Sequence, residues 1–269
     1  MIDPHAVVSA QADLAPDVTV GPFCVIGAQV RIGRGTVVGP HAVISGPTTL
    51  GADNRIFPFA SIGDAPQDKK YRGEPTRLEI GDRNVFRESC TVNRGTAHDH
   101  GVTRIGDDNL FMAYSHVAHD CSVGSNVVFA NCAALGGHVE IGDWVILGGL
   151  TAVHQFTKVG AHAFLAGGAI VTRDVPPYVM VAGNPAVPHA VNTEGLKRRG
   201  FDAGQIVAKA VETASTNDPK KLREAIENVD GIKAVSATPA HPFGPQNHEC
   251  LRPQDVFLGV WRNGSVVRM

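Results

Sequence analysis

The sequence predicts an all-β protein, a parallel β-helix whose coils have three flat sides like a triangular prism. An aliphatic residue recurs at every sixth position, a glycine often follows it, and a small or β-branched residue stands four places after it. The chain has 269 residues with 30 glycines, and only 6% of them are aromatic, so large rings do not dominate the core. A period of six matches neither an α-helix, with about 3.6 residues per turn, nor an ordinary strand, with a period of about two. It is typical of hexapeptide β-helices.

The aliphatic repeat runs in three blocks, which begin at Ile2, Ile80 and Ile105. Each hexad would form one short strand and one corner, and three hexads would close a coil. Residues 18 positions apart would then stack at the spacing of paired strands, about 4.8 Å. Asn54 and Asn109 are the exceptions at the position that is otherwise small or β-branched.

Two polar insertions, residues 64–79 and 97–104, interrupt the repeat. Loops that leave a rigid scaffold often carry function. Alternatively, each could be a tolerated insertion without a role, and this interpretation has more weight for residues 97–104 than for residues 64–79.

The repeat and the signals for helices and turns that follow it divide the chain into three regions. Asp218 and Pro219 form an N-cap and first-turn pair, which predicts a helix over 219–229 after another over 205–214. Asn263 and Gly264 predict the turn of a hairpin. The predicted regions are the β-helix (1–186) with its two loops, a helical segment (187–231), and a tail with a terminal hairpin (232–269).

Composition excludes several classes of protein. Lys and Arg total 24 against 26 Asp and Glu, a formal charge of −2, which argues against a nucleic-acid binder. No apolar run reaches about 18 residues, so no transmembrane helix is expected. The N-terminus lacks the pattern of a secretory signal. Five cysteines, an odd number in a chain of this length, do not indicate a fold held together by disulfides. A cytoplasmic location is therefore expected.

The histidines gather in one part of the repeat: His116, His119, His138, His154 and His162 fall within 47 positions. Asp120 and His138 are 18 positions apart and should stack on adjacent coils, with His119 as a diagonal neighbour. Two imidazoles and a carboxylate at close range form a plausible general-base constellation. The carboxylate would hold the tautomer and stabilise the imidazolium, as the acid of a serine-protease triad does.

Other interpretations stay open. Each histidine alone is more often structural than catalytic. Trimeric γ-class carbonic anhydrases share the predicted prism and bind zinc with three histidines, which here would be His116, His119 and either His138 or one across a subunit interface. A non-enzymatic interaction subunit is the third interpretation. Cys121 falls at an inward position of the hexad, which disfavours it as a nucleophile.

Six segments are similar to a known family. They are 66–89 (PQDKKYRGEPTRLEIGDRNVFRES), 116–131 (HVAHDCSVGSNVVFAN), 136–144 (GGHVEIGDW), 149–156 (GLTAVHQF), 174–185 (DVPPYVMVAGNP) and 191–201 (VNTEGLKRRGF). From residue 1 to about 203 the chain resembles the bacterial acyl-ACP–UDP-N-acetylglucosamine O-acyltransferases, which perform the first acylation of lipid A synthesis. The resemblance implies a left-handed β-helix, a homotrimer with sites between subunits, an acyl carrier protein as donor, and no cofactor or metal.

The resemblance also implies roles for individual residues. His119 would be the general base, supported by Asp120, while the N–H of Gly137 would hold the oxyanion. His138 would position the substrate. Family positions near the sugar, phosphates or acyl chain are matched by Asp68, Lys70, Tyr71, His116, His154 and Gln155. Those that hold the nucleotide are matched by Asn192, Glu194, Arg198 and Arg199.

Gly167 falls where the family measures acyl-chain length, and a glycine there favours longer chains. The sequence departs from the family pattern at Asn93 and Pro185, both of which stand where a histidine is common. A larger departure is expected from residue 204 onward. Residues 204–269 resemble the C-terminal stretch of periplasmic branched-chain amino-acid-binding proteins, which suggests a chimera or an unusual fusion and puts carrier-protein docking in question.

Overall fold

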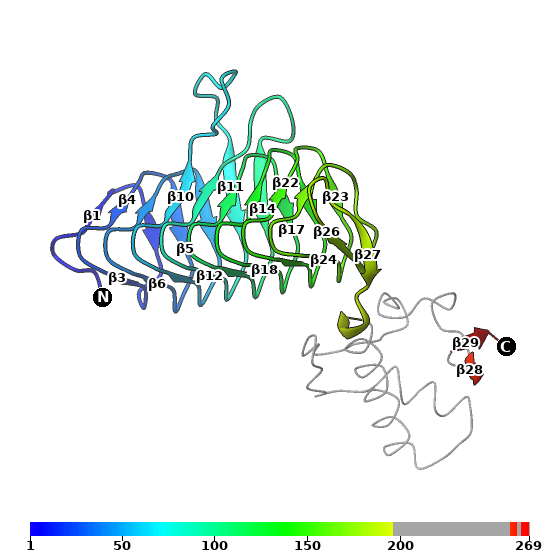
Figure 1. The fold of residues 1–269 in the computed structure, drawn as a ribbon. Coiled ribbons are helices and arrows are strands. Elements are labelled where there is room, and N and C mark those ends of the chain that lie inside the picture. Colours follow the sequence, from blue (N-terminus) through cyan, green and yellow to red (C-terminus); the bar gives the residue numbers. More distant parts are fainter. Residues whose placement is uncertain (196–258, 263–264, 269) are drawn as a thin grey trace, which may run out of the picture. The chain divides into compact units, whose positions relative to one another are not determined.

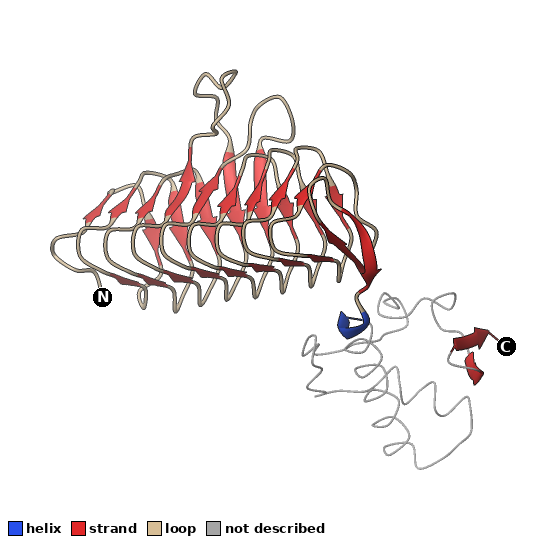
Figure 2. Ribbon diagram, viewed as in Figure 1, coloured by secondary structure: helices blue, strands red, loops and turns tan. Residues whose placement is uncertain are grey.

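A computed structural model describes residues 1–195, 259–262 and 265–268. The chain divides into two compact units, residues 1–195 and 196–269. The first unit is a coil with three flat sides, in which short strands alternate with turns (Figures 1 and 2). The architecture predicted from the six-residue period is confirmed.

Each side of the coil is one sheet, and we number the sheets in the order in which the chain enters them. Sheet 1 contains β1 (Val7–Val8), β4 (Val25–Ile26), β7 (Val43–Ile44), β10 (Ser61–Asp64), β13 (Thr91–Asn93), β16 (His116–Val117), β19 (Ala134–Leu135), β22 (Ala152–Val153) and β25 (Ile170–Val171). Sheet 2 contains β2 (Asp13–Leu14), β5 (Val30–Ile32), β8 (Thr48–Leu50), β11 (Arg77–Ile80), β14 (Val102–Ile105), β17 (Ser122–Val123), β20 (Glu140–Ile141) and β23 (Lys158–Val159). Sheet 3 contains β3 (Thr19–Val20), β6 (Val37–Val38), β9 (Arg55–Ile56), β12 (Val85–Phe86), β15 (Leu110–Phe111), β18 (Val128–Phe129), β21 (Ile146–Leu147), β24 (Phe164–Leu165), β26 (Val179–Ala182) and β27 (Val187–Val191).

Strand pairing has the predicted register of 18. Val7 pairs with Val25 in parallel, and the same step recurs along all three sheets. Two coils are longer: Ser61 pairs with Thr91, and Thr91 pairs with His116. The extra residues form the loops between β10 and β11 and between β13 and β14, which project from one side of the coil (Figure 1). The loops themselves span residues 65–76 and 94–101, and we call them the 64–79 loop and the 97–104 loop after the predicted insertions.

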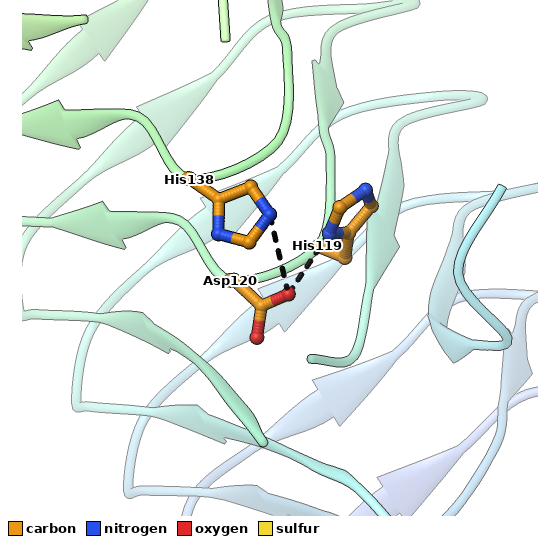
Figure 3. A group of neighbouring side chains, drawn as sticks. All are labelled: His119, Asp120 and His138. Carbon is orange, nitrogen blue, oxygen red and sulfur yellow. Dashed lines mark hydrogen bonds and ion pairs between the residues drawn. The ribbon is translucent and has the colours of Figure 1, made fainter. Parts of the chain in front are cut away.

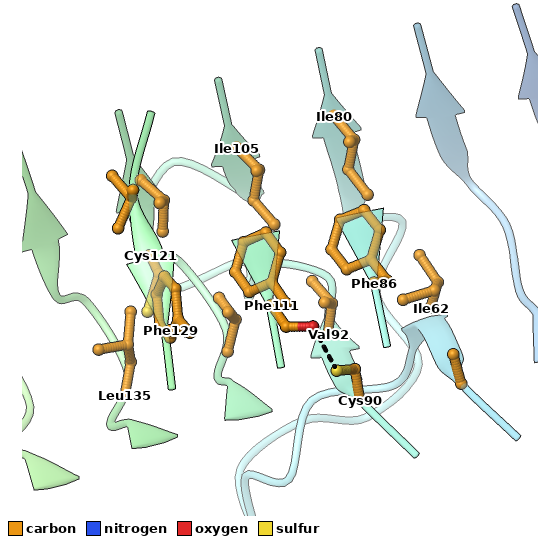
Figure 4. Close-up of a cluster of buried hydrophobic side chains, with 14 of the residues drawn as sticks. Ile62, Ile80, Phe86, Cys90, Val92, Ile105, Phe111, Cys121, Phe129 and Leu135 are labelled. Carbon is orange, nitrogen blue, oxygen red and sulfur yellow. Dashed lines mark hydrogen bonds between the residues drawn. The ribbon is translucent and has the colours of Figure 1, made fainter. Parts of the chain in front are cut away.

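The core is a column of inward-pointing side chains along the coil axis. Every predicted hexad position from Val20 to Val171 is buried, and three phenylalanines lie among the aliphatic residues (Figure 4). The rings of Phe86, Phe111 and Phe129 stack on successive coils with centroids 4.6 Å apart. Few aromatic rings are needed, because one aliphatic or phenylalanine side chain at each hexad position fills the narrow prism.

The asparagines that broke the repeat form a buried ladder. The side-chain oxygen of Asn54 accepts a hydrogen bond from the amide of Asn84, and Asn84 does the same for Asn109. Each side-chain amide donates to the carbonyl of a corner glycine. Because these buried polar groups all find partners, asparagine is tolerated where the pattern otherwise requires a small side chain.

Two corners of the coil carry different kinds of side chain. The site corner joins sheet 1 to sheet 2 and includes Asp120, His138 and Phe156, whose φ angles of 59–66° are left-handed. The ridge corner joins sheet 3 to sheet 1. It carries His41 and, among the exposed residues at its turns, Phe23, Phe59, Tyr114 and Leu150.

The end of the first unit differs from the prediction. Residues 187–191, expected to open a helical segment, form β27, which pairs antiparallel with β26. Helical structure begins only at residues 193–195. The predicted helices over 205–214 and 219–229 lie outside the described residues.

The terminal hairpin has its predicted strands. β28 (Gly259–Arg262) and β29 (Ser265–Arg268) pair antiparallel, with Arg262 opposite Ser265, as a two-residue turn requires. None of the helical structure in the described part of the chain could span a bilayer.

Candidate active site

Several of the predicted site residues gather along one edge of sheet 1. The chain leaves β10 into the 64–79 loop, and passes from β16 to His119 and Asp120. It passes from β19 to His138 and from β22 to Gln155. Because parallel strands in one sheet present their carboxyl ends at the same edge, one coil after another adds a polar side chain there.

His119 and Asp120 form a hydrogen-bonded pair at the site corner (Figure 3). The imidazole Nδ1 lies 2.9 Å from Asp120 Oδ2, and the histidine side chain is 15% exposed against 1% for the aspartate. A carboxylate bound to Nδ1 holds the neutral ring in the tautomer whose Nε2 carries a lone pair. His119 is thereby equipped to accept a proton at Nε2.

Asp120 is held by contacts that the sequence pattern did not reveal. The hydroxyl of Thr96 donates to Oδ2 at 2.6 Å, and the Thr96 amide lies within 3.0 Å of both carboxylate oxygens. The amide of Asp120 donates to the hydroxyl of Thr103. Burial by itself would raise the pKa of Asp120, but the hydrogen bonds from His119 and Thr96 outweigh it and lower this pKa below its ordinary value of 3.8. Asp120 therefore stays ionised beside the base.

His138 joins this pair from the next coil. Its Nε2 lies 4.0 Å from Asp120 Oδ2, and its ring meets that of His119 at 88° with centroids 5.0 Å apart (Figure 3). One face of the His138 ring stacks on Phe156 at 4.4 Å. Its Nδ1 lies 2.7 Å from Oδ2 of Asp99, a residue of the 97–104 loop. The three residues brought together by the 18-residue register are therefore joined by a fourth from an insertion.

Gly137 is buried against the base. A Cβ built on it would lie 2.6 Å from Cε1 of His119, so no larger residue fits without displacing the ring. The Gly137 amide donates no hydrogen bond within the described residues. A buried N–H without an acceptor is uncommon and points to one supplied by a ligand.

His116 lies one strand before the base. Its Nδ1 is 2.7 Å from the hydroxyl of Thr91, and burial, followed by the charge of His119, lowers its pKa. His116 is accordingly a neutral polar group beside the site.

The 64–79 loop is tied together by its own predicted residues. Asp68 accepts a hydrogen bond from the amide of Lys70, and the Tyr71 hydroxyl donates to the carbonyl of Glu74. The guanidinium of Arg94 donates to the same hydroxyl and to the carbonyl of Gly63. The loop is thus fastened at its base, while Lys70 is exposed. No contact joins these residues to His119 among those described.

The predicted residues from later coils are more dispersed. His154 and Gln155 are exposed at the site corner, two coils beyond His119. Gly167 lies instead at the ridge corner, across sheet 1 from the base. An added Cβ there would meet only ordinary van der Waals contacts, so the space beside Gly167 is open.

The predicted nucleotide residues begin where the coil ends. The Asn192 side chain donates to the carbonyl of His162 and accepts from the amide of Gly195, so it caps the helical turn at 193–195. Glu194 lies on that turn. Arg198 and Arg199 lie outside the described residues.

Metal-ligand geometry is present, but not in the predicted set. One ligand atom each from His119, Asp120 and His138 lie within 4.8 Å of one another, whereas His116 is not part of this cluster. Asp120 Oδ2 already accepts from Thr96 and contacts His119, and His138 Nδ1 is engaged by Asp99. The protein's own hydrogen bonds therefore occupy positions that a metal would need.

Three of the described cysteines have a structural role, as expected for Cys121. Cys24, Cys90 and Cys121 are buried. Burial raises the pKa of Cys90 to about 11 and that of Cys121 to about 12, which keeps both as thiols and unsuited to nucleophilic catalysis.

Comparison with known proteins first defines the class. The profile of the bacterial transferase hexapeptide, six repeats long, matches residues 12–46 and 103–137, so the coil carries the repeat of the hexapeptide transferases. The profile "Udp N-acetylglucosamine O-acyltransferase; Domain 2" matches residues 174–243.

Individual relatives narrow the class. An acyl-[acyl-carrier-protein]–UDP-N-acetylglucosamine O-acyltransferase from Thiobacillus denitrificans is 63% identical over 207 residues, 77% of this chain and 80% of that one. A protein of the same name from Verminephrobacter eiseniae is 59% identical over 268 residues, 98% of both chains. This chain belongs to the family of acyl-[acyl-carrier-protein]–UDP-N-acetylglucosamine O-acyltransferases.

Solved structures agree. LpxA from Acinetobacter baumannii superposes with a TM-score of 0.74 at 41% identity, over 84% of this chain and 90% of that one. The UDP-N-acetylglucosamine acyltransferase of Francisella novicida gives a TM-score of 0.73 at 38% identity, over 97% of this chain and all of the other. The fold is therefore the left-handed parallel β-helix that the resemblance implied.

The expected departure near residue 204 is corrected by two of these comparisons. The profile of the family's second domain continues to residue 243, and the Verminephrobacter relative aligns over nearly the whole chain. A fusion with an unrelated protein is therefore not needed to explain the tail.

Proposed function

We propose that this protein transfers a 3-hydroxyacyl chain from acyl carrier protein to the 3-hydroxyl of UDP-N-acetylglucosamine, the first step of lipid A biosynthesis. The observation that carries the proposal is the His119 imidazole: Asp120 occupies its Nδ1, and its ring packs against Gly137, whose amide donates no hydrogen bond within the described residues. A base and an oxyanion donor side by side are what acyl transfer to a hydroxyl needs.

The reaction follows from this geometry. His119 Nε2 takes the proton of the sugar 3-hydroxyl while that oxygen attacks the thioester carbonyl. The Gly137 N–H stabilises the oxyanion of the tetrahedral intermediate. The C–S bond then breaks, and the thiolate of the carrier's prosthetic group takes the proton back from the imidazolium. Asp120, ionised and buried, stabilises the imidazolium between these two transfers.

We assign the remaining predicted residues to binding of the two substrates. Lys70, exposed on the 64–79 loop, supplies a positive charge for the phosphates, and Asp68, Tyr71, His116, His154 and Gln155 line the same edge of sheet 1. The acyl chain would cross the outer surface of sheet 1, over Ala134 and Ala152, toward the open space at Gly167. Asn192, Glu194, Arg198 and Arg199 would hold the nucleotide.

A homotrimer accounts for the apolar outer surface of the coil. Sheet 1 presents Val7, Val25 and Val43 to solvent, and the ridge corner presents Leu150, 69% exposed. The outward positions of sheet 2 are instead mostly charged, and include Asp13, Arg31, Arg104, Glu140 and Lys158. If three ridge corners face a common axis, sheet 1 of each subunit meets sheet 3 of the next in a closed ring.

Sedimentation equilibrium tests this assembly. Leu150→Glu should dissociate the trimer, whereas Arg31→Glu on sheet 2 should leave it intact. A wild-type protein that sediments as a monomer would contradict it.

We also place the enzyme in the cytoplasm. All four cysteines of the described residues are free thiols, which suits a reducing compartment.

The decisive experiment is an acyl-transfer assay with UDP-N-acetylglucosamine and carrier proteins loaded with 3-hydroxyacyl chains of graded length. The wild type should transfer an acyl group, and His119→Ala should lose about 10²–10⁴-fold in kcat, the usual contribution of a general base. Absence of transfer by the wild type would refute the proposed function. Full activity of His119→Ala would refute the assignment of His119 as the general base.

The same purified protein decides between the alternatives. Stoichiometric zinc together with carbon dioxide hydration would favour the carbonic-anhydrase-like interpretation. A non-enzymatic interaction subunit would be indicated if His119→Ala changed no measurable property.

A further inference from the structure

The 97–104 loop reaches the site through one side chain. Asp99 Oδ2 lies 2.7 Å from Nδ1 of His138, and its other oxygen lies 3.4 Å from Nε2 of His100. The Asp99 amide donates to the carbonyl of Thr96, the residue whose hydroxyl holds Asp120. The loop is therefore anchored to Asp120 at its start and to His138 at its turn.

The surroundings of His138 restrain its ring incompletely without Asp99. Stacking on Phe156 at an interplanar angle of 8° determines the plane of the ring. It does not determine which way round the ring lies, because an imidazole turned by 180° in χ2 keeps the same plane. The two orientations differ only in where the nitrogens point.

Asp99 removes this ambiguity. A carboxylate accepts only from a nitrogen that bears hydrogen, so the contact selects both the ring orientation and the presence of a hydrogen on Nδ1. Nε2 is then directed toward the pair formed by Asp120, 4.0 Å away, and His119 (Figure 3). In the turned ring a carbon would take that place.

We propose that Asp99 is a positioning residue that sets the ring orientation and tautomer of His138, so that the 97–104 loop is part of the site and not a tolerated insertion. The expected rate effect rests on the proposed acyl transfer, whereas the expected state of the ring does not. Partners that hold a metal-ligating histidine by its second ring nitrogen typically change activity about 10–100-fold when removed, and we expect an effect at the lower end of this range for His138.

The test combines spectroscopy and kinetics on the full chain. In the ¹⁵N-histidine-labelled protein, the two-bond ¹H–¹⁵N pattern of His138 should show a hydrogen on Nδ1. Asp99→Ala should convert this pattern to mixed tautomers and lower kcat/KM about tenfold. Asp99→Asn keeps an oxygen that can accept from Nδ1 and should restore most of both.

Two controls separate positioning from general damage to the loop. His98→Ala changes an exposed neighbour on the same loop and should alter neither readout. In a His138→Ala background, Asp99→Ala should cause no further loss of rate, because its effect acts through the missing ring.

Specific outcomes would overturn the proposal. They are an unchanged His138 pattern in Asp99→Ala, an Asp99→Asn variant as impaired as the alanine variant, or the same loss of rate in the His138→Ala background. If the wild type transfers no acyl group, the proposed function fails while the spectroscopic result still decides the role of Asp99.

Discussion

The site corner and the ridge corner contain the same structural motif with different outcomes. His41 at the ridge and His138 at the site both occupy left-handed corner positions and stack on a phenylalanine one coil away. His138 also has Asp99 and Asp120 beside it, whereas His41 lies between the rings of Phe23 and Phe59. Among the described residues, none forms an ion pair with His41.

The difference teaches that the repeat supplies positions but not chemistry. Any corner of the coil can align side chains 18 positions apart. Within the described residues, only the site corner has loops inserted at its edge, and the 97–104 loop and its ends bring one carboxylate to His138 and hydroxyl groups to Asp120. The comparison can be tested by changing matched positions at the two corners.

The largest difference is expected for the glycines that precede the corner residues. Gly137→Ala places a Cβ 2.6 Å from the His119 ring and should displace the base, which lowers kcat about 100-fold. Gly149→Ala, at the equivalent turn position of the ridge corner, meets only Asn131 O at 3.4 Å. It should leave the His119 ring in place and lose far less activity. Equal losses in steady-state assays of the two variants would remove the distinction between the corners.

A smaller effect is expected on stability, and it depends on pH. The hydrogen bonds from Thr96 and His119 lower the pKa of Asp120 in the folded protein below 3.8, the ordinary pKa of an aspartate. These bonds therefore stabilise the fold fully at pH values above 3.8. This stabilisation is lost as the pH falls through the lowered value. Asp120→Asn should therefore cost about 1.5–3 kcal/mol at neutral pH. The variant and the wild type should converge only below about pH 4.

Denaturant unfolding at a series of pH values measures this difference. A deficit that is the same at pH 3 and pH 7 would show that the carboxylate charge is not what these donors stabilise.

The smallest effect is expected at the ridge. His41→Ala removes a ring that contacts only other rings, and such contacts contribute about 0.5–1.5 kcal/mol. Its kcat should remain within about twofold of the wild type, because no proton acceptor or substrate group lies beside it. A tenfold loss of rate in the acyl-transfer assay would mean that His41 itself takes part in the reaction.

Much of the site was predictable because the period is strict. The spacing of 18 places His138 over Asp120, and in the structure His138 Nε2 lies 4.0 Å from Asp120 Oδ2. The ladder that includes Asn54 and Asn109 was not predictable in this way, since a pattern of apolar positions does not represent hydrogen bonds between side-chain amides and the backbone.

The sequence by itself determined the coil, its register and the corner at which the histidines meet, because a short period repeated many times leaves one way to bury its aliphatic residues. Only the tertiary structure decided that Thr96 and Thr103 hold Asp120 and that Asp99 holds His138. Those residues belong to an insertion and its ends, where no periodicity relates position in the chain to position in space. Their contacts depend on how the loop folds back over the coil.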